Sequence, residues 1–291
     1  RTYATAIRAG RRPTADAYYD SEIHCRKTGT PGKIGLYEDL LMQVYEPARL
    51  AQELLEEGIT VMKIWPFDVI ARETRGLSIS ASQLRDAIWP IEEIRKAVGD
   101  KIDIMLEYHG MWHLAPAIKI AHATDEFGIY WHEDPIWMQN FDDLAYYCDA
   151  VAGPVCGSEN MGTLNWYREM FRRGSLDVAN FDVAWIGGIT EGQKIAHLAE
   201  AYNRTIAPPD CTGPVTLVAN SHILAAASNG QIAETVRAYC AGFYPTVITE
   251  VPFISNGYIS PPTGPGLGTK LRDSFLARQD VSTRVTEQVC G

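Results

Sequence analysis

The chain has 291 residues, 46% of them hydrophobic, with a net charge of −10 and a pI near 5.2. An acidic chain without a Lys/Arg cluster lacks the features of a nucleic-acid surface, so we expect a small-molecule substrate and no nucleic-acid partner. No apolar run approaches the ~18 residues needed to span a membrane, so we expect no membrane partner. Six scattered cysteines lack the spacing of a metal or redox motif and indicate free thiols in a reducing, cytoplasmic compartment: Cys25, Cys148, Cys156, Cys211, Cys240 and Cys290.

The N-terminal part of the chain predicts a short leading segment and the first strand–helix steps. Residues 1–17 have no strong period, whereas residues 18–25 alternate and predict a first strand, followed by a long loop rich in Gly and Pro. Residues 46–58 have helical spacing and end at a glycine, and residues 59–67 form an apolar run with a proline near its end. This helix-to-strand transition predicts the second step of a repeating βα pattern.

The same alternation continues to residue 236. The next helix begins after Ser80 and ends before Gly99, two residue types that favour helix caps. Helices are predicted at 80–100, 114–128, 140–153, 164–174, 190–203 and 213–229. Strands are predicted at 101–107, 129–133, 154–159, 177–182, 205–209 and 230–236. Unbroken alternation of this kind predicts an α/β fold with a parallel sheet, and the length suits one (β/α) barrel.

From about residue 240 the sequence becomes rich in Pro and Gly, with the run "NGYISPPTGPGLG". Such a segment cannot form a helix and suits a stretch that packs over the barrel. The predicted organisation is therefore a residual N-terminal segment at 1–17, a catalytic barrel at 18–239 and a C-terminal segment at 240–291.

Acidic residues stand at the ends of consecutive predicted strands. Glu107, Glu133, Glu159 and Asp182 are separated by 26, 26 and 23 residues, about the length of one βα unit. Because a barrel gathers the C-terminal ends of its strands at one mouth, we expect these carboxylates to converge there. Hard oxygen ligands prefer Mg²⁺ or Mn²⁺, so the three glutamates predict a divalent metal site. A single acid in such a position is an ordinary loop residue; three in phase favour the metal.

Further polar residues are in position to serve the same site. His109 stands two residues beyond Glu107, so in extended chain both side chains point to one side, and imidazole transfers protons near neutral pH. A histidine bonded to a loop carbonyl is equally compatible with the spacing alone. Lys63 and Trp65 share the same spacing, and Lys63 at a strand end presents a cation to an anionic substrate, although an isolated lysine is more often a surface residue. Glu234 lies at the last predicted strand. The neighbouring His132 is out of phase and has no assigned role.

The local sequences resemble the enolase superfamily, specifically the mandelate racemase group and its acid-sugar dehydratases of the galactonate type. The motifs "LEYHG", "HEDP", "GSE", "FDVAWIGGITEGQKIA", "CTGPVTLVANSH", "IAETVR" and "NGYISPPTGPGLG" run in family order over roughly residues 18–270. The resemblance implies a (β/α)₇β barrel, an α+β capping domain, homo-oligomers and loss of water from an acid sugar to give a 2-keto-3-deoxy acid. It implies a Mg²⁺ site, with Mn²⁺ also possible, formed by Glu107, Glu133 and Glu159.

Roles for other residues also follow from the resemblance. Asp182 matches the aspartate of an Asp–His dyad, His109 matches the dehydratase general acid, and Glu234 matches the acid that hydrogen-bonds the substrate. Lys63 joins these as a catalytic candidate. Trp65 and Asp210 are the candidate substrate-binding residues.

Three departures from the family pattern limit this transfer. The dyad histidine is replaced by Pro209, which carries no proton, and the adjacent Asp210 is out of phase in an extended segment. Trp65 replaces the second lysine of the family's Lys-x-Lys motif. We also expect most of the N-terminal capping domain to be missing, because the first predicted strand begins only about twenty residues into the chain. A racemase, epimerase or cycloisomerase, or a metal-binding member with impaired catalysis, therefore stays open beside the dehydratase.

Overall fold

The computed structural model describes residues 37–284. Their main sheet has six parallel strands in the order of the sequence. The strands are β1 (Val61–Ile64), β2 (Asp103–Glu107), β3 (Ile129–Glu133), β4 (Val155–Gly157), β5 (Val178–Ala179) and β6 (Thr205–Ile206). Each lies within a predicted strand. The alternating α/β pattern and the parallel sheet are confirmed.

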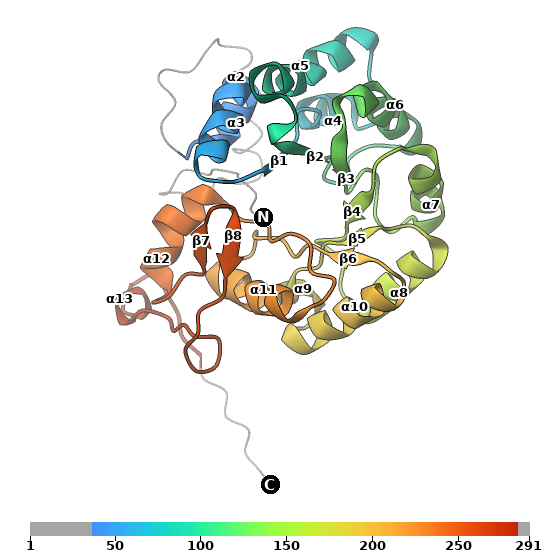
Figure 1. Ribbon diagram of the computed structural model, residues 1–291. Helices are drawn as coiled ribbons and strands as arrows, with labels where there is room; N and C mark the ends of the chain where they lie inside the picture. The colour runs from blue at the N-terminus through green and yellow to red at the C-terminus, as the bar shows by residue number, and fades with distance from the viewer. Residues whose placement is uncertain (1–36, 285–291) are drawn as a thin grey trace.

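Helices surround the strands in an outer ring (Figure 1). The longer ones are α3 (Pro47–Glu56), α5 (Ala81–Val98), α6 (Leu114–Thr124), α7 (Phe141–Ala150), α8 (Leu164–Arg173), α10 (Ile189–Ala201) and α11 (Pro214–Ala226). Each of these was predicted from its spacing. Shorter helices that the sequence pattern did not reveal are α2 (Asp39–Tyr45), α4 (Asp68–Thr74) and α9 (Val183–Ile186), with single 3₁₀ turns at Gly99–Lys101 and Asp125–Phe127.

The predicted caps of α5 explain where this helix begins and ends. The Ser80 side chain accepts a hydrogen bond from the Gln83 backbone N–H, and the Gln83 side chain accepts one from the Ser80 N–H, which together form a capping box. Gly99 follows the last turn with a φ of 61°. The helix continues through the buried Pro90. Local capping therefore fixes the length of this helix.

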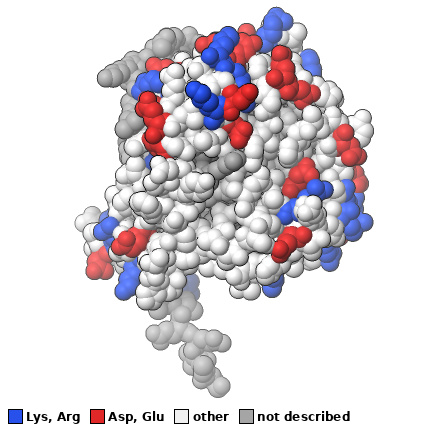
Figure 2. All heavy atoms as spheres, viewed as in Figure 1, with Lys and Arg blue, Asp and Glu red and all other residues white. Residues whose placement is uncertain are grey.

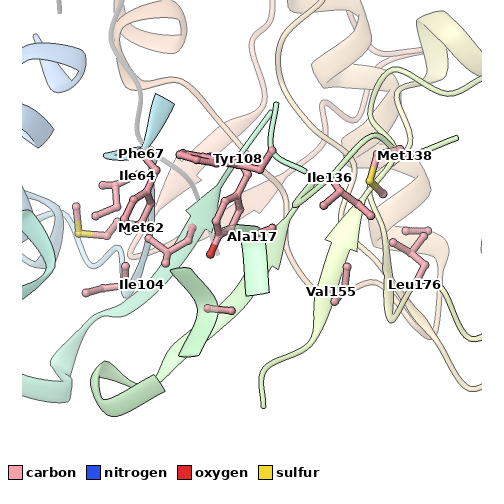
Figure 3. Packing of buried hydrophobic residues seen from close by; sticks show 14 of the residues in the cluster. Met62, Ile64, Phe67, Ile104, Tyr108, Ala117, Ile136, Met138, Val155 and Leu176 are labelled. Atoms are coloured by element: carbon pink, nitrogen blue, oxygen red, sulfur yellow. The ribbon is translucent and has the colours of Figure 1, made fainter. Parts of the chain in front are cut away.

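Two apolar layers lie on opposite sides of the sheet. One lies between the strands and the helices, where alternate strand residues such as Met62, Ile64 and Ile104 share one apolar cluster with Ala117 of α6 (Figure 3). The other lies inside the ring of strands and includes Val61, Trp65, Met105, Trp131, Cys156, Val178, Ala207 and Ile232. Because side chains alternate along a strand, the odd-numbered positions of β1 and β2 face this interior.

The prediction of a last strand at 230–236 is wrong. This segment runs beside β6 and makes an isolated parallel bridge, between Ile206 and Gly230. Its hydrogen bonds run from the Ile206 N–H to the Asn229 carbonyl at 3.1 Å and from the Gln231 N–H to the Ile206 carbonyl at 2.9 Å. The residues after Ala207 are Pro208 and Pro209, which have no backbone N–H to donate, so the pairing continues only through a long hydrogen bond of 3.4 Å from the Glu234 N–H to the Pro208 carbonyl. Within residues 37–284 the hydrogen-bonded sheet therefore spans β1 to β6 and is not closed into a full ring. The predicted first strand at 18–25 and the segment 1–17 lie outside the described residues.

The C-terminal segment forms small elements of its own. A single π-helical turn (Tyr239–Phe243) leads into α12 (Tyr244–Val247), and an antiparallel hairpin of β7 (Phe253–Ser255) and β8 (Tyr258–Ser260) precedes α13 (Asp273–Leu276). The hairpin turn is Asn256–Gly257, and both residues have positive φ, as a tight two-residue turn requires. A Cβ on Gly257 would lie 2.3 Å from the Gly58 carbonyl oxygen, so the hairpin tip packs closely on the loop between α3 and β1. The predicted domain boundary at 239/240 stays a prediction.

Charged side chains of both signs are distributed around the rim of the face in Figure 2, and no broad patch of one sign covers it. Within residues 37–284 no helix combines the length and the apolar character needed to cross a membrane.

Candidate active site

The interior side chains change from apolar to polar toward the C-terminal ends of the strands. On β1, Val61 is followed by Lys63, and on β2, Met105 is followed by Glu107, all facing the same interior. The same step occurs between Trp131 and Glu133 on β3. The period of two that places the apolar interior residues therefore also places the polar ones at the mouth of the strand ring.

Lys63 lies at the centre of this polar group. Its ammonium forms a close ion pair with Glu133 Oε1 and lies 3.2 Å from Glu107 Oε2. It also donates to both carboxylate oxygens of Glu234 at 3.0 Å. The Lys63 side chain is only 4% exposed, so this predicted site residue is not a surface lysine. Three predicted site carboxylates therefore converge on one predicted site cation.

Two further residues hold the Glu133 carboxylate, and the sequence did not identify either. Asn180 Nδ2 donates to Glu133 Oε1 at 2.7 Å and to Glu234 Oε1 at 3.3 Å. Trp131 Nε1 donates to Glu133 Oε2 at 2.9 Å. Both stand two residues before a predicted site acid, Asn180 before Asp182 and Trp131 before Glu133. This two-residue spacing, which puts both side chains on the same face of a strand, is the signal that could have revealed them.

Burial and mutual repulsion perturb these carboxylates. The pKa of Glu133 is raised to about 8, mainly by burial and then by the nearby Glu107 carboxylate, while Lys63 opposes the shift. Burial likewise raises the pKa of Glu107 and raises that of Glu234 well above its usual value. One ammonium thus offsets only part of the negative charge that the cluster carries when ionised, and a further cation would be stabilised there.

His109 reaches the site by a turn of the backbone. Its φ is 50°, in the left-handed region, so the extended geometry predicted from Glu107 does not continue. The His109 N–H donates to Glu107 Oε1 at 2.7 Å, and His109 Nδ1 lies 2.7 Å from Asp68 Oδ2. Burial acts to lower the pKa of His109, but the Asp68 and Glu107 carboxylates outweigh it and raise this pKa well above its usual value. The edge of the Trp65 ring faces the imidazole, with 5.7 Å between ring centroids.

Asp68 is a site residue that the sequence analysis missed. It is fully buried at the start of α4, three residues after Trp65. The run "WPFD" contains it, but its spacing from the in-phase residues Lys63 and Trp65 places it in the following loop and helix. Only the tertiary arrangement brings it to His109.

The predicted third metal ligand, Glu159, is near enough to Glu133 for its charge to help raise the pKa of that carboxyl. The Glu159 carboxylate accepts a hydrogen bond from Asn160 Nδ2 at 3.4 Å and from Cys211 Sγ at 3.6 Å. Within residues 37–284 no three His, Cys, Asp or Glu side chains are arranged to hold a metal ion. The carboxylate oxygens of Glu107, Glu133 and Glu159 are of the donor type that fits a hard divalent cation.

Where the resemblance implies an Asp–His dyad, no histidine among residues 37–284 contacts Asp182. Asp182 Oδ1 accepts from the Ala184 N–H and its Oδ2 from the Thr212 hydroxyl, each at 2.7 Å. The predicted substrate-binding residue Asp210 uses Oδ1 to accept from the Tyr244 hydroxyl at 2.5 Å and Oδ2 to accept from the Val236 N–H at 3.1 Å. Both aspartates are therefore engaged by neighbouring protein groups.

His132, to which the sequence assigned no role, belongs to the packing between strands and helices. Its Nδ1 and the Tyr108 hydroxyl share a hydrogen bond of 2.8 Å, and its ring is fully buried. Burial lowers the pKa of His132 to about 4, so the ring is neutral at neutral pH.

The chain is similar in sequence to several acid-sugar dehydratases and in fold to several solved structures. The chain is 27% identical over 200 residues to an arabinonate dehydratase of Saccharolobus solfataricus, a match that covers 69% of this chain and 53% of that protein. It is 28% identical over 215 residues to a D-galactonate dehydratase of Ralstonia nicotianae, covering 72% of this chain and 56% of that protein. The chain spans about half the length of the curated relatives that it matches.

Solved structures agree with these sequence matches. An enolase protein from environmental sequencing of the Sargasso Sea is 38% identical, with a TM-score of 0.75 over 79% of this chain and 62% of that one. An enolase of the mandelate racemase subgroup from Agrobacterium tumefaciens is 36% identical, with a TM-score of 0.77 over 93% of this chain and 77% of that one. A family model described as "Enolase C-terminal domain-like" matches residues 46–275. This chain therefore belongs to the enolase superfamily, through its C-terminal domain-like family.

Proposed function

We propose that this protein is a Mg²⁺-dependent dehydratase of an acid sugar. The reaction removes the proton next to the substrate carboxylate and expels the hydroxyl on the next carbon as water, giving a 2-keto-3-deoxy acid. The convergence of Glu107, Glu133 and Glu234 on Lys63 is the observation that carries this proposal. The dehydratase names of the relatives support it, although the match extends over only part of each relative.

The metal requirement rests on the charge balance of the cluster. Glu107, Glu133 and Glu159 would hold the Mg²⁺, with oxygen ligands of the type that this ion prefers. The raised pKa values of Glu107 and Glu133 reflect buried negative charge that one ammonium offsets only in part. When bound, Mg²⁺ supplies a positive charge that stabilises the negative charge developing on the substrate carboxylate.

The remaining residues bind the substrate and transfer protons. Lys63 presents its ammonium to the substrate's anionic end, and Glu234 offers a hydrogen-bonding partner beside it. Trp65 forms an apolar wall next to His109. His109 donates the proton that lets the departing hydroxyl leave as water, because its imidazole is partly exposed at the mouth and is paired with a carboxylate.

A second candidate is a metal-binding relative with altered or impaired catalysis. Pro209 occupies the position of the family's histidine base, and Asp182 is engaged by Thr212 and a backbone N–H instead of an imidazole. General-base catalysis typically contributes about 10²–10⁴ in rate, so a member without that base would turn over slowly. Racemase, epimerase and cycloisomerase activities also stay open, and they differ from a dehydratase because they release no water.

A screen of aldonic and aldaric acids with Mg²⁺ tests the proposal. The expected result is 2-keto acid formation with at least one acid, dependent on Mg²⁺ and lost in the Glu133→Gln variant. An isomeric product that retains the water would favour a racemase, epimerase or cycloisomerase. Mg²⁺ binding by calorimetry without consumption of any acid would favour the impaired member. Substrate identity, the predicted homo-oligomer and the cytoplasmic location stay predictions.

A further inference from the structure

Four buried side chains form a closed ring of hydrogen bonds at the mouth. The Lys63 ammonium donates to Glu133 and Glu234, and the Asn180 amide donates to the same two carboxylates, so donors and acceptors alternate around the ring. Lys63 is 4% exposed, and the other three members are no more than 1% exposed. The ring is therefore part of the protein interior and is shielded from bulk water.

The order of the strands places Asn180 in this ring. Lys63 lies on β1 and Glu133 on β3, and Glu234 lies in the segment that runs beside β6. Asn180 directly follows β5, where its backbone N–H still donates to the Gly157 carbonyl at 3.0 Å. Layers of side chains from alternate strands fill the interior of (β/α) barrels. The ring corresponds to such a layer, with polar side chains in place of the usual apolar ones.

The ring determines which oxygen of Glu133 can bind a cation. A carboxylate has about four acceptor positions, divided between its two oxygens. Lys63 and Asn180 both donate to Oε1, and the Trp131 indole donates to Oε2 at 2.9 Å. With these donors, all from the described part of the chain, the acceptor position left for a metal is on Oε2.

The backbone holds Glu107 in a similar way. The N–H groups of Tyr108 and His109 both donate to Glu107 Oε1, at 3.0 and 2.7 Å. The other oxygen, Oε2, lies 3.2 Å from the Lys63 ammonium in the cluster. Each of these two predicted metal ligands therefore presents one oxygen to a cation. Backbone N–H groups impose this on Glu107, whereas side chains impose it on Glu133.

The amide of Asn180 suits a positioning role better than a packing role. A carboxylate oxygen accepts hydrogen bonds, so the NH₂ group and not the carbonyl faces Glu133 and Glu234. Asn180 Oδ1 is buried and has no hydrogen-bond partner within residues 37–284. A buried carbonyl without a partner destabilises a fold, and a leucine of the same branched shape would avoid that cost. The bonds from the NH₂ group therefore account for an amide at this position.

We propose that Asn180 is a positioning residue that selects Mg²⁺ over Ca²⁺, and this inference rests on the metal site of the proposed function. By holding Oε1, Asn180 restricts Glu133 to a single metal-binding oxygen. Mg²⁺ requires a compact octahedron of oxygens, which single carboxylate oxygens and water can complete. Ca²⁺ takes ~6–8 oxygens and often binds both oxygens of one carboxylate. A carboxylate restricted to one oxygen therefore favours the smaller ion.

Calorimetry with MgCl₂ and CaCl₂ tests this selectivity without any turnover. The parent protein should bind Mg²⁺ more tightly than Ca²⁺. In Asn180→Leu the Mg²⁺ affinity should fall about 10–100-fold, the usual effect of removing a side chain that orients a metal ligand, while the Ca²⁺ affinity changes much less. Asn180→Ala lacks the same donor and is too small to clash, so it should shift the ratio of the two affinities in the same direction.

Asn220→Leu is the matched control. Asn220 is 1% exposed, and its Oδ1 also has no hydrogen-bond partner within residues 37–284. Its amide donates at 2.9 Å to the Pro209 carbonyl, a backbone group instead of a carboxylate. This substitution should lower the unfolding free energy and leave the ratio of Mg²⁺ to Ca²⁺ affinity unchanged. A ratio that shifts equally in the two leucine variants refutes the positioning role.

The remaining outcomes separate this inference from the proposed function. Equal or tighter binding of Ca²⁺ by the parent protein, which requires no variant, refutes the selectivity, as does an unchanged ratio in a folded Asn180 variant. If the parent binds neither ion, the metal assignment of the proposed function fails and this inference fails with it. If the ratio depends on Asn180 while no aldonic or aldaric acid yields a 2-keto acid, the proposed dehydratase fails and the role of Asn180 stands.

Discussion

Replacement of Arg237 by methionine should destabilise the fold more than any exposed charge change. The Arg237 side chain is 4% exposed and donates to Asp39 Oδ2 at 2.9 Å and Oδ1 at 2.5 Å. It also donates to Glu57 at 2.7 Å and lies over the Tyr37 ring at 5.0 Å. This network joins α2 and α3 to the segment just after Glu234, across 198 residues of sequence.

The magnitude follows from Asp39, which has an exposed fraction of 0%. Burial raises the pKa of Asp39 even with Arg237 present, so the loss of the guanidinium leaves a buried carboxylate without its main partner. Breaking a buried ion pair in this way costs about 3–5 kcal/mol, a large share of the ~5–15 kcal/mol by which domains are stable. Glu57 is 39% exposed and can turn to water, so Asp39 accounts for most of the cost.

Urea unfolding of a four-member set measures this: the parent, Arg237→Met, Asp39→Leu and the double variant. The single arginine variant should lose about 3–5 kcal/mol of unfolding free energy, and the double variant should recover most of that loss, because the fully buried Asp39 charge is then gone. Arg278→Met, which breaks an exposed pair with Asp280, is the control and should leave the urea midpoint unchanged. A loss below about 1 kcal/mol in Arg237→Met, or a double variant no more stable than that single variant, contradicts the argument.

Four further changes are predicted. Glu133→Gln should weaken Mg²⁺ binding measured by calorimetry, and equal affinity would make the metal assignment wrong. Gly157→Ala should destabilise by about 1–3 kcal/mol in thermal or urea unfolding, because the new Cβ would lie 2.3 Å from Asp134 Oδ1, and an unchanged midpoint would contradict this close packing. Burial raises the pKa of Asp210 from 3.8 to about 7, so between pH 4 and 7 the unfolded state loses this proton first and folding stability falls as pH rises. As pH rises from 4 to 7, the unfolding free energy of Asp210→Asn should therefore increase by roughly 4 kcal/mol relative to that of the parent. Parallel curves of unfolding free energy against pH for the two proteins would refute this. Pro209→His should speed α-proton exchange in a carboxylate substrate, and no gain over an already fast parent would mean that the base lies elsewhere.

The order of strands and long helices could be predicted because local signals determine it. The Ser80 and Gly99 caps define α5, and the 26-residue interval between acids follows from the length of one βα unit. The last strand could not be predicted correctly from its apolar composition. Pairing depends on the partner, and the two residues that follow Ala207 after β6 are prolines, which cannot donate backbone hydrogen bonds. Short helices such as α4 and α9, at 7 and 4 residues, lack enough turns to give a helical period.

The candidate site could be predicted where side chains alternate regularly along a strand, and it could not be predicted where that alternation ends. Glu107 and Glu133 converge with Lys63 as the alternation of side chains requires, and the same alternation accounts for Asn180. Asp68 lies beyond the strand, in the loop that begins α4, so no period in the sequence connects it with His109. Contacts of this kind depend on how neighbouring loops fold over one another.

The residues at which this alternation ends lie at comparable positions and share a left-handed backbone conformation. His109, Asp134 and Ser158 have φ values of 50°, 41° and 83°, and each lies within two residues of a predicted metal ligand. A left-handed residue reverses the direction of the chain, so it ends the strand phase and changes where the next side chain points. This conformation is uncommon for residues with side chains, and contacts such as the hydrogen bond from the Ser158 N–H to Asp134 Oδ1 at 2.7 Å help to hold it. The regular spacing in the sequence therefore places the acids at the mouth of the strand ring. The left-handed residues then determine which side chains meet there, and His109 meets Asp68 in this way.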